Sequence, residues 1–388
     1  MTEVQALFLI LAAIYLVQCV VWVPEDCVVL RRGLARSWHF APGGLLLAAL
    51  KLRGVPVNPL PPLPGVIVCE PPKVFISPEG IAAPVQAAAG SLECMKLEFF
   101  TFDQISAIRA EEKKLVLHSQ PLCSFGSPLM ARDVVALLSK VKSASKAERP
   151  GTIAAYWRAA FDGKAISERI ATYYEHTALL RLACNLLFLL LFGLIPLTVW
   201  RRGVAGTWPF LLAGLMAYLV VISSDFIRAH KALYPTAGDE RVTDALSVVL
   251  SPAGALRAND LLLKNLLFAF HPVAVARQLC SEPVFMAFAS RALRELSFPL
   301  PFEGASQAEQ ARRWWFEQEL RAVRTFLVKV GINPQELLAP PDREPGCHSF
   351  CPRCCSQYVP TAGVCKECGD IELCPFPDAP IAQSMGAP

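Results

Sequence analysis

The chain has 388 residues, of which 54% are hydrophobic and only 18% are charged, and its mean hydropathy is +0.40. Soluble domains carry about 25% charged residues, so this composition predicts membrane segments beside soluble ones. The net charge of +4 is small and no Lys- or Arg-rich run stands out, so we expect no nucleic-acid partner. Seven of the 14 cysteines lie between Cys347 and Cys374, which favours one metal site in a reducing compartment over a disulfide scaffold.

Three segments are long and apolar enough to cross a bilayer, for which a helix needs about 20 residues. They are Val4–Val23, Leu182–Trp200 and Thr207–Ser224, and none contains Asp, Glu, Lys, Arg or His. The first, within residues 1–24, lacks the basic start of a signal peptide, so we expect an uncleaved span. The other two predict a transmembrane helical hairpin over residues 182–224. The predicted fold class is an α+β multi-pass membrane protein with three transmembrane helices.

The Lys and Arg residues near the ends of these segments predict their orientation, because cytoplasmic loops carry an excess of positive charge. Only Arg201 and Arg202 lie in the turn of the hairpin, on the face shared with the N-terminus. This predicts an integral protein of the cell or inner membrane with its N-terminus outside and with residues 24–181 and 225–388 in the cytoplasm. The basic residues of the cytoplasmic face are Arg31, Arg32, Arg36, Lys164, Arg169, Arg181, Arg228, Lys231 and Arg241.

Residues 25–64 are basic at first and then rich in proline, which predicts a linker. Residues 65–145 alternate short apolar runs with turn signals, which predicts a small α+β soluble domain. Glu111–Lys114 is its charged hairpin tip, and Ala131–Lys142 is its helix. This order resembles pleckstrin-homology-like barrels, which implies binding of lipid headgroups or peptides; the alternative is a small domain without a ligand. The expected strands are Val66–Cys69, Val74–Ile76, Cys94–Phe102, Ile105–Ile108 and Leu115–Leu117.

Residues 150–181 predict two juxtamembrane helices, the first capped at its N-terminus by Thr152. The predicted spans contain no ionisable residue, and intramembrane charges usually mark ion or proton pathways. We therefore interpret the hairpin as an anchor. Within it, Gly193 and Pro196 favour a local distortion of the first helix, while Trp200 and Trp208 are placed as an aromatic belt would be.

Residues 225–340 predict a helical cytoplasmic region. Leu261–Phe270 is too short to span, so it is either a buried helix or one that lies at the membrane surface. Gln307–Val330 is the clearest soluble helix, followed by a short turn that Asn333 caps. In it, Arg312–Trp315 either contacts anionic lipid or packs on neighbouring helices. Its expected apolar stripe is Phe316, Leu320, Val323, Leu327 and Val330.

The strongest motif is a pair of C-x-x-C knuckles near the C-terminus. Cys351 and Cys354 form the first, and ten residues later Cys365 and Cys368 form the second, followed by Gly369. This spacing brings four thiolates to about 2.3 Å from one tetrahedral zinc ion. Four protein ligands leave no open coordination position, so a structural Zn²⁺ is predicted; iron is the main rival.

The two knuckles resemble the four-cysteine zinc ribbon over about Ser349–Leu373, with Tyr358 and Val359 as a short strand between them. We place the ribbon at residues 345–376 and expect a disordered tail at 377–388. Additional potential ligands leave the set open at this stage: Cys355 directly follows Cys354 and could replace it. The others are Cys347, His348 and Cys374.

No P-loop, dinucleotide-binding glycine motif, H-E-x-x-H or G-x-S-x-G occurs in the chain. No catalytic or cofactor-binding residue is therefore nominated. The leading hypothesis is a non-enzymatic, membrane-anchored scaffold that contacts the lipid bilayer and binds a protein partner on its cytoplasmic side, with a second copy of the chain as another candidate partner. The alternatives are an enzyme or enzyme subunit acting at the membrane surface and an accessory subunit of a transport complex.

Overall fold

The computed structural model describes residues 3–21, 28–31, 34–37, 67–69, 74–85, 96–203, 208–250, 252–256, 258–280, 282–299, 306–369 and 371–377. The proline-rich part of the expected linker and the expected tail after 377 lie outside these residues. The chain forms two compact units. The first comprises Met1–Pro71, Ser127–Met130 and Gly163–Leu279, and the second comprises Pro72–Gly126, Ala131–Asp162 and Cys280–Pro388.

The first unit is built on a long helical hairpin. One arm is continuous helix through α6 (Ala178–Leu189), a π-helical turn η1 (Leu190–Leu194) and α7 (Ile195–Arg202). The other arm is α8 (Trp208–Leu233). Tyr218 donates a hydrogen bond from its hydroxyl to the Ala183 carbonyl at 2.9 Å, which places these two residues at the same level of the hairpin. The π-turn confirms the distortion expected near Gly193 and Pro196, and π-turns of this kind interrupt otherwise regular α-helices.

Two helical segments, Ala178–Arg201 and Leu211–Leu233, are long and apolar enough to cross a membrane. They overlap the predicted spans 182–200 and 207–224. Both segments contain buried apolar residues, such as Leu187 and Leu219, and a further set of large aliphatic side chains that are 42% to 60% exposed. The exposed residues are Leu179, Leu182, Leu186, Leu189, Leu194 and Leu197 on the first arm, and Leu212, Met216, Val220, Val221 and Ile227 on the second.

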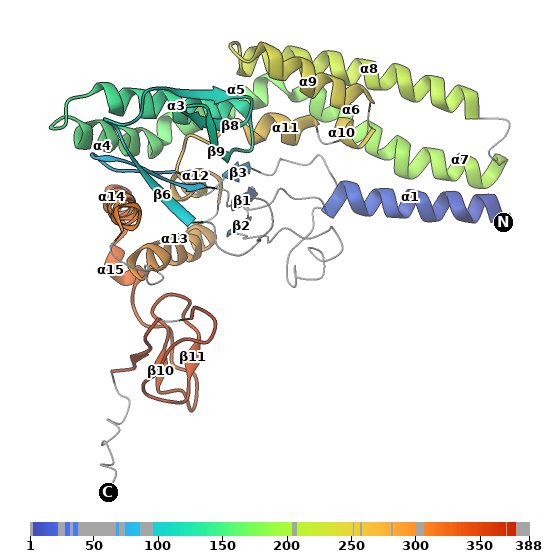
Figure 1. The fold of residues 1–388 in the computed structure, drawn as a ribbon. Helices are drawn as coiled ribbons and strands as arrows, with labels where there is room; N and C mark the ends of the chain where they lie inside the picture. Colours follow the sequence, from blue (N-terminus) through green and yellow to red (C-terminus); the bar gives the residue numbers. More distant parts are fainter. Residues whose placement is uncertain are drawn as a thin grey trace, which may run out of the picture. The chain divides into compact units, whose positions relative to one another are not determined.

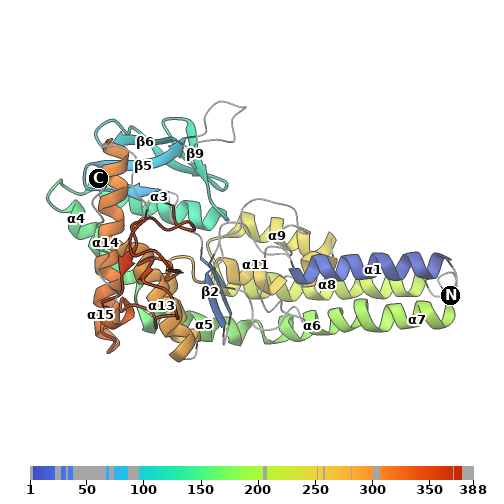
Figure 2. The same ribbon diagram turned by 90° about the horizontal axis from the view of Figure 1, so that it is seen from below.

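Helix α1 (Glu3–Val21) coincides with the first predicted span. It is not one of the two helices found to be long and apolar enough to cross a membrane, so the third span remains a prediction. Gln5 donates from Nε2 to the carbonyls of Val199 and Trp200 at 3.2 and 3.3 Å, where α7 ends and its last carbonyls lack helical partners. Figures 1 and 2 both show α1 along the hairpin, with its N-terminus at the end where the hairpin turns.

The hairpin is extended by α5 (Gly163–His176) before it and by α9 (Gly238–Leu250), α10 (Pro252–Leu256), α11 (Ala258–Lys264) and α12 (Pro272–Leu279) after it. Leu261–Phe270 was expected to be either a buried helix or one at the membrane surface, and its side chains that the structure describes favour the buried one. Leu262, Leu266 and Leu267 are at most 2% exposed. The helix there ends at Lys264, before the expected segment does.

The first unit also contains a three-stranded antiparallel sheet of order β2-β1-β3. Its strands are β1 (Val28–Arg31), β2 (Leu34–Ser37) and β3 (Ile67–Cys69). β1 and β2 therefore lie inside the expected linker, and β3 pairs with β1 instead of joining the strands that follow it. Strands of three or four residues have too little alternation to be recognised, and the partner of β3 is far away in the sequence.

Besides the small sheet near the C-terminus described below, the second unit contains two antiparallel sheets, each of three consecutive strands. The first sheet is formed by β4 (Phe75–Ile76), β5 (Gly80–Val85) and β6 (Lys96–Thr101), and the second by β7 (Ile108–Glu111), β8 (Lys114–Leu117) and β9 (Gln120–Ser124). The charged tip at Glu111–Lys114 is confirmed, because these two residues pair across a two-residue turn. Strand β7 begins at Ile108, so the strand expected at Ile105–Ile108 is wrong in position: Ile105 is buried before the strand begins.

Helices α3 (Pro128–Ser143), α4 (Arg149–Ala160), α13 (Glu282–Ser297), α14 (Gln307–Lys329) and α15 (Pro334–Leu337) complete the second unit, apart from the first residues of α3. The expectation that Thr152 caps α4 is wrong. The cap position is Glu148, and Pro150 lies within the first turn, where its missing N–H costs nothing. The Asn333 cap of α15 is confirmed, since its side chain accepts from the Gln335 N–H.

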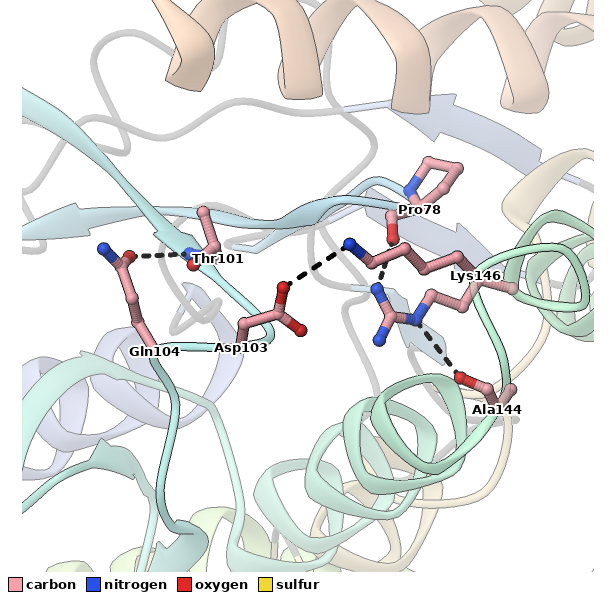
Figure 3. Close-up of polar contacts among 7 residues, drawn as sticks. Pro78, Thr101, Asp103, Gln104, Ala144 and Lys146 are labelled. Atoms are coloured by element: carbon pink, nitrogen blue, oxygen red, sulfur yellow. Dashed lines mark hydrogen bonds and ion pairs between the residues drawn. The ribbon is translucent and has the colours of Figure 1, made fainter.

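One buried arginine ties the start of α4 to the first sheet. Arg149, which is 6% exposed, donates to the Pro78 carbonyl at 2.9 Å and to the Ala144 carbonyl at 3.3 Å. Its guanidinium lies 4.8 Å from the centre of the Phe102 ring. Figure 3 draws Pro78 and Ala144 with dashed lines for the hydrogen bonds that they accept, together with the exposed Lys146–Asp103 ion pair. Hydrogen bonds from a buried charge to carbonyls contribute more stability than neutral ones, so Arg149 holds the start of α4 against the turn between β4 and β5.

Helix α14 packs on the β4-β5-β6 sheet and on α4 through aromatic rings. Trp315 is 3% exposed, and its ring centre lies 4.8 Å from that of Trp157. Phe316 lies 5.5 Å from Phe75. Arg312–Trp315 was expected either to contact anionic lipid or to pack on neighbouring helices, and Trp315 packs within the protein. The expected stripe is only partly correct. Val323 and Leu327 are buried, but the other expected members Phe316, Leu320 and Val330 are only half-buried. The rest of the buried face consists of Ala308, Ala311, Trp315 and Phe326.

Candidate metal centre

The first C-x-x-C knuckle follows a two-residue strand. β10 (Ser349–Phe350) is the central strand of a small antiparallel sheet, between β11 (Gln357–Tyr358) and β12 (Cys374–Pro375). The chain leaves β10 at Cys351 and returns at Ser356, whose carbonyl accepts from the Cys351 N–H at 2.9 Å. The tight return requires a left-handed backbone at Cys355, with φ of 65°. Antiparallel pairing thus determines where the first two thiols lie.

The second knuckle closes in the same way. The Cys365 N–H donates to the Ile371 carbonyl at 2.9 Å, and Val364 pairs with Glu372 in an isolated bridge. Gly369, directly after Cys368, has φ of 73°, a conformation that glycine adopts at no steric cost. Glycine at this position therefore suits the turn that follows the second knuckle.

The two knuckles bring four thiols together. The sulfur atoms of Cys351, Cys354, Cys365 and Cys368 all lie within 4.8 Å of one another, and the group could hold a metal ion. A tetrahedral ion with metal–sulfur distances of about 2.3 Å requires sulfur atoms about 3.8 Å apart. The Cys354 and Cys365 sulfurs are 3.6 Å apart. The fold therefore brings together the four cysteines that the sequence predicted as metal ligands.

The thiols differ in their surroundings. Cys351 and Cys365 are completely buried against Ile371 and Leu373, whereas Cys354 is exposed. Burial raises the pKa of Cys351 to about 11. Burial would also raise the pKa of Cys365, but hydrogen bonds from the Tyr358 hydroxyl and from backbone N–H groups outweigh it and lower this pKa to about 6. Donors directed at sulfur favour the thiolate, which is the form that binds metal.

Tyr358 has a specific position beside this centre. Its hydroxyl lies 3.2 Å from the Cys365 sulfur and accepts a hydrogen bond from the Lys366 N–H at 3.3 Å. With its oxygen accepting from the backbone, the hydroxyl can donate its own proton toward the Cys365 sulfur. The sequence indicated Tyr358 only as part of a strand; its role toward the metal ligand depends on the fold.

The other candidate ligands lie outside the group of four. Cys355, whose backbone is left-handed, is not part of this group, and His348 has its Nδ1 2.8 Å from the Arg343 guanidinium. Cys347 and Cys374 are half-buried free thiols. Among the residues that the structure describes, the only group of at least three Cys, His, Asp or Glu side chains with metal-site spacing is the predicted one.

A buried arginine attaches the first knuckle to the helical body. Arg294 on α13 is 5% exposed and donates to the Pro352 carbonyl at 3.0 Å and to the Ala339 carbonyl. Its Nε lies 3.4 Å from the hydroxyl of Ser290, which in turn donates to the Leu337 carbonyl at 2.7 Å. The sequence offered no signal for this contact, because Arg294 looks like any polar residue of a helix.

A second polar cluster lies in the first unit, at the base of the hairpin. His230 on α8 is 1% exposed, with its ring between Phe226 and Tyr234. Among the described residues, neither of its ring nitrogens has a hydrogen-bond partner, and neither does the buried Nδ2 of Asn259. The Tyr173 hydroxyl donates to Oδ1 of Asn259 at 3.4 Å. Sequence reasoning missed this cluster, because its members are dispersed over three helices.

Comparisons with protein-family models, with curated proteins and with solved structures each found no match to this chain.

Proposed function

We propose that the protein is a membrane-anchored scaffold whose cytoplasmic parts, including a structural zinc ribbon, bind a protein partner. The observation that carries the proposal is the group of four thiols, attached to the folded body through Arg294. Zinc is the ion that fits best, because two C-x-x-C knuckles with four thiolates are typical of closed structural zinc sites. Such a site has no position for a substrate, so it stabilises a surface and performs no chemistry.

The exposed apolar side chains of the hairpin support insertion in a bilayer. The contact of Gln5 with the end of α7 supports the relative topology, because it places the start of α1 beside the turn of the hairpin. If α1 also spans, the N-terminus and Arg201 are on the same side, and the more numerous basic residues are on the other. The soluble segments before α5 and after α8 then lie together in the cytoplasm.

The ribbon presents apolar surface that the fold leaves uncovered. Val359 is 67% exposed and Val364 is 54% exposed, and both lie between the two knuckles. A domain of this size has little apolar material to spare, and exposed apolar groups on a rigid support are typical of protein contact sites. The proposed partner surface is therefore the loop between the knuckles.

Photo-crosslinking from this loop tests the proposal. A photoreactive amino acid is placed at position 359 in the full chain, and a matched variant carries it at Val328 of α14, which is 64% exposed. The scaffold function predicts one reproducible crosslinked protein from position 359 and none from position 328. The same crosslink must disappear in Val364→Asp with metal content unchanged. Equal crosslinking from both positions, or none from either, would contradict the proposal.

The cluster of His230, Asn259 and Tyr173 favours a second candidate, an enzyme or enzyme subunit at the membrane surface. Buried polar atoms without partners are rare in folded proteins and are concentrated at binding sites. This function predicts that a lipid or small molecule co-purifies with the protein and is lost in Asn259→Ala. Mass spectrometry of protein purified in mild detergent provides the measurement. If both proteins carry the same molecules, the cluster is structural.

A further inference from the structure

Helix α9 runs back along α8 toward the middle of the hairpin. After α8 ends at Leu233, the chain turns and α9 begins at Gly238. Ser223 donates from its hydroxyl to the Ala245 carbonyl at 3.1 Å, so the middle of α9 lies beside Ser223. Five more residues to Leu250 add about 7.5 Å along the helix. Figure 1 shows α9 alongside α8.

Two further hydrogen bonds show how far α9 and α10 extend along the helical hairpin. Cys184 donates from its thiol to the Ala255 carbonyl of α10 at 3.3 Å. Its neighbour Ala183 is at the level of Tyr218, because their hydrogen bond joins the two arms. Ala255 of α10 is therefore level with residues that lie inside both candidate spans, Ala178–Arg201 and Leu211–Leu233.

The polarity of α9 changes along its length in the direction that this position requires. Its charged residues all lie in its first half, ending at Asp244, and no charged residue follows before Leu250. Val242, Leu246 and Leu250 are four residues apart, form one stripe and are 61%, 54% and 76% exposed. Among the large apolar side chains of the described residues, Leu250 is the most exposed. The opposite face, which includes Ala245 and Val248, is buried.

We propose that α9 and α10 form a re-entrant hairpin, which enters the cytoplasmic leaflet beside the spans and returns without crossing. Lipid acyl chains cover the stripe of Val242, Leu246 and Leu250. A non-spanning segment at membrane depth requires backbone groups satisfied by the protein, and the Cys184 thiol satisfies the Ala255 carbonyl of α10 in this way. The inference rests on the proposed membrane insertion and adds a second lipid-contacting element to it.

Depth-dependent fluorescence quenching in vesicles tests the proposal. An environment-sensitive fluorescent amino acid is incorporated at position 250 in the full chain, and the protein is reconstituted with lipids that carry a nitroxide either on the headgroup or deep in the acyl chain. Position 220 on α8 is the lipid-facing reference, and position 359 on the ribbon is the water-facing reference. Asp239, at the start of α9, is the matched position on the same helix. Unchanged metal content shows that the ribbon of each labelled protein is folded, and an unchanged far-ultraviolet circular dichroism spectrum shows that its helices are.

The re-entrant hairpin predicts that the acyl-chain nitroxide quenches position 250 as strongly as position 220, and several-fold more strongly than positions 239 and 359. Quenching at 220 without quenching at 250 would overturn the re-entrant hairpin and leave membrane insertion intact. Absence of quenching at both would overturn membrane insertion as well. Protection of position 250 from lipid and water quenchers alike would mean that a protein partner or a second copy covers the stripe, which would also overturn the proposal.

Discussion

Replacing Arg294 by Met should loosen the ribbon from the helical body. Arg294 is almost completely buried and donates to the Pro352 and Ala339 carbonyls, which belong to the first knuckle and to the segment that follows α15. Methionine retains much of the apolar stem but has no donor. The variant therefore leaves two carbonyls unpaired while changing little of the packing.

The magnitude follows from these two contacts. A hydrogen bond from a charged group contributes about 1.5–3 kcal/mol, so the loss of two costs about 3–6 kcal/mol of local stability. Because about 1.4 kcal/mol corresponds to a factor of ten in an equilibrium constant, the opening equilibrium should rise at least about 100-fold. Local opening is the appropriate quantity, since a chain with two units does not unfold in one step.

Hydrogen exchange measured on peptides that cover α15 and the first knuckle provides the assay. Arg291→Met is the matched control: Arg291 lies on the same helix, and its 2.9 Å ion pair with Glu295 is exposed. Exposed pairs of this kind contribute about 0.3–0.5 kcal/mol, so exchange in the control should rise by a factor of about two. Equal exchange rates in the two variants would refute the assignment of Arg294 as the attachment point.

Three further predictions concern the metal centre and the first sheet. Elemental analysis should find one metal ion per chain, which is lost in the Cys351→Ser/Cys368→Ser variant; disulfides at these positions would contradict both the metal and the cytoplasmic location. Tyr358→Phe removes the hydroxyl 3.2 Å from the Cys365 sulfur and should weaken metal affinity about 10- to 100-fold in chelator competition, and an unchanged affinity would show that this contact is incidental. Gly80→Ala places a Cβ 2.2 Å from the Phe100 carbonyl oxygen and should lower the stability of the second unit by about 1–3 kcal/mol. In Gly151→Ala on α4 nothing lies within 4 Å of the new Cβ, so this variant should be more stable by about 0.5–1 kcal/mol. The reverse order of stabilities in thermal unfolding would contradict the packing described.

Local patterns determined much of this protein. The grouping of the four cysteines followed from spacing alone, because a C-x-x-C knuckle constrains its own backbone and two of them suffice for four ligands. The two arms of the hairpin followed from apolar length, the tip at Glu111–Lys114 from its charge, and the cap at Asn333 from a preference that acts over three residues. Each of these features depends on interactions within a few residues of the chain.

The tertiary structure alone decided which segments belong together. Strand β3 pairs with β1 and not with its neighbour β4, and the expected helical region 225–340 is divided between the two units. Arg294, the cluster around His230 and the return of α9 along α8 gave no sequence signal, because each depends on a partner that is distant in the sequence or on the level at which two helices meet. Pairings of this kind are set by packing and register, which periodicity within one segment does not encode.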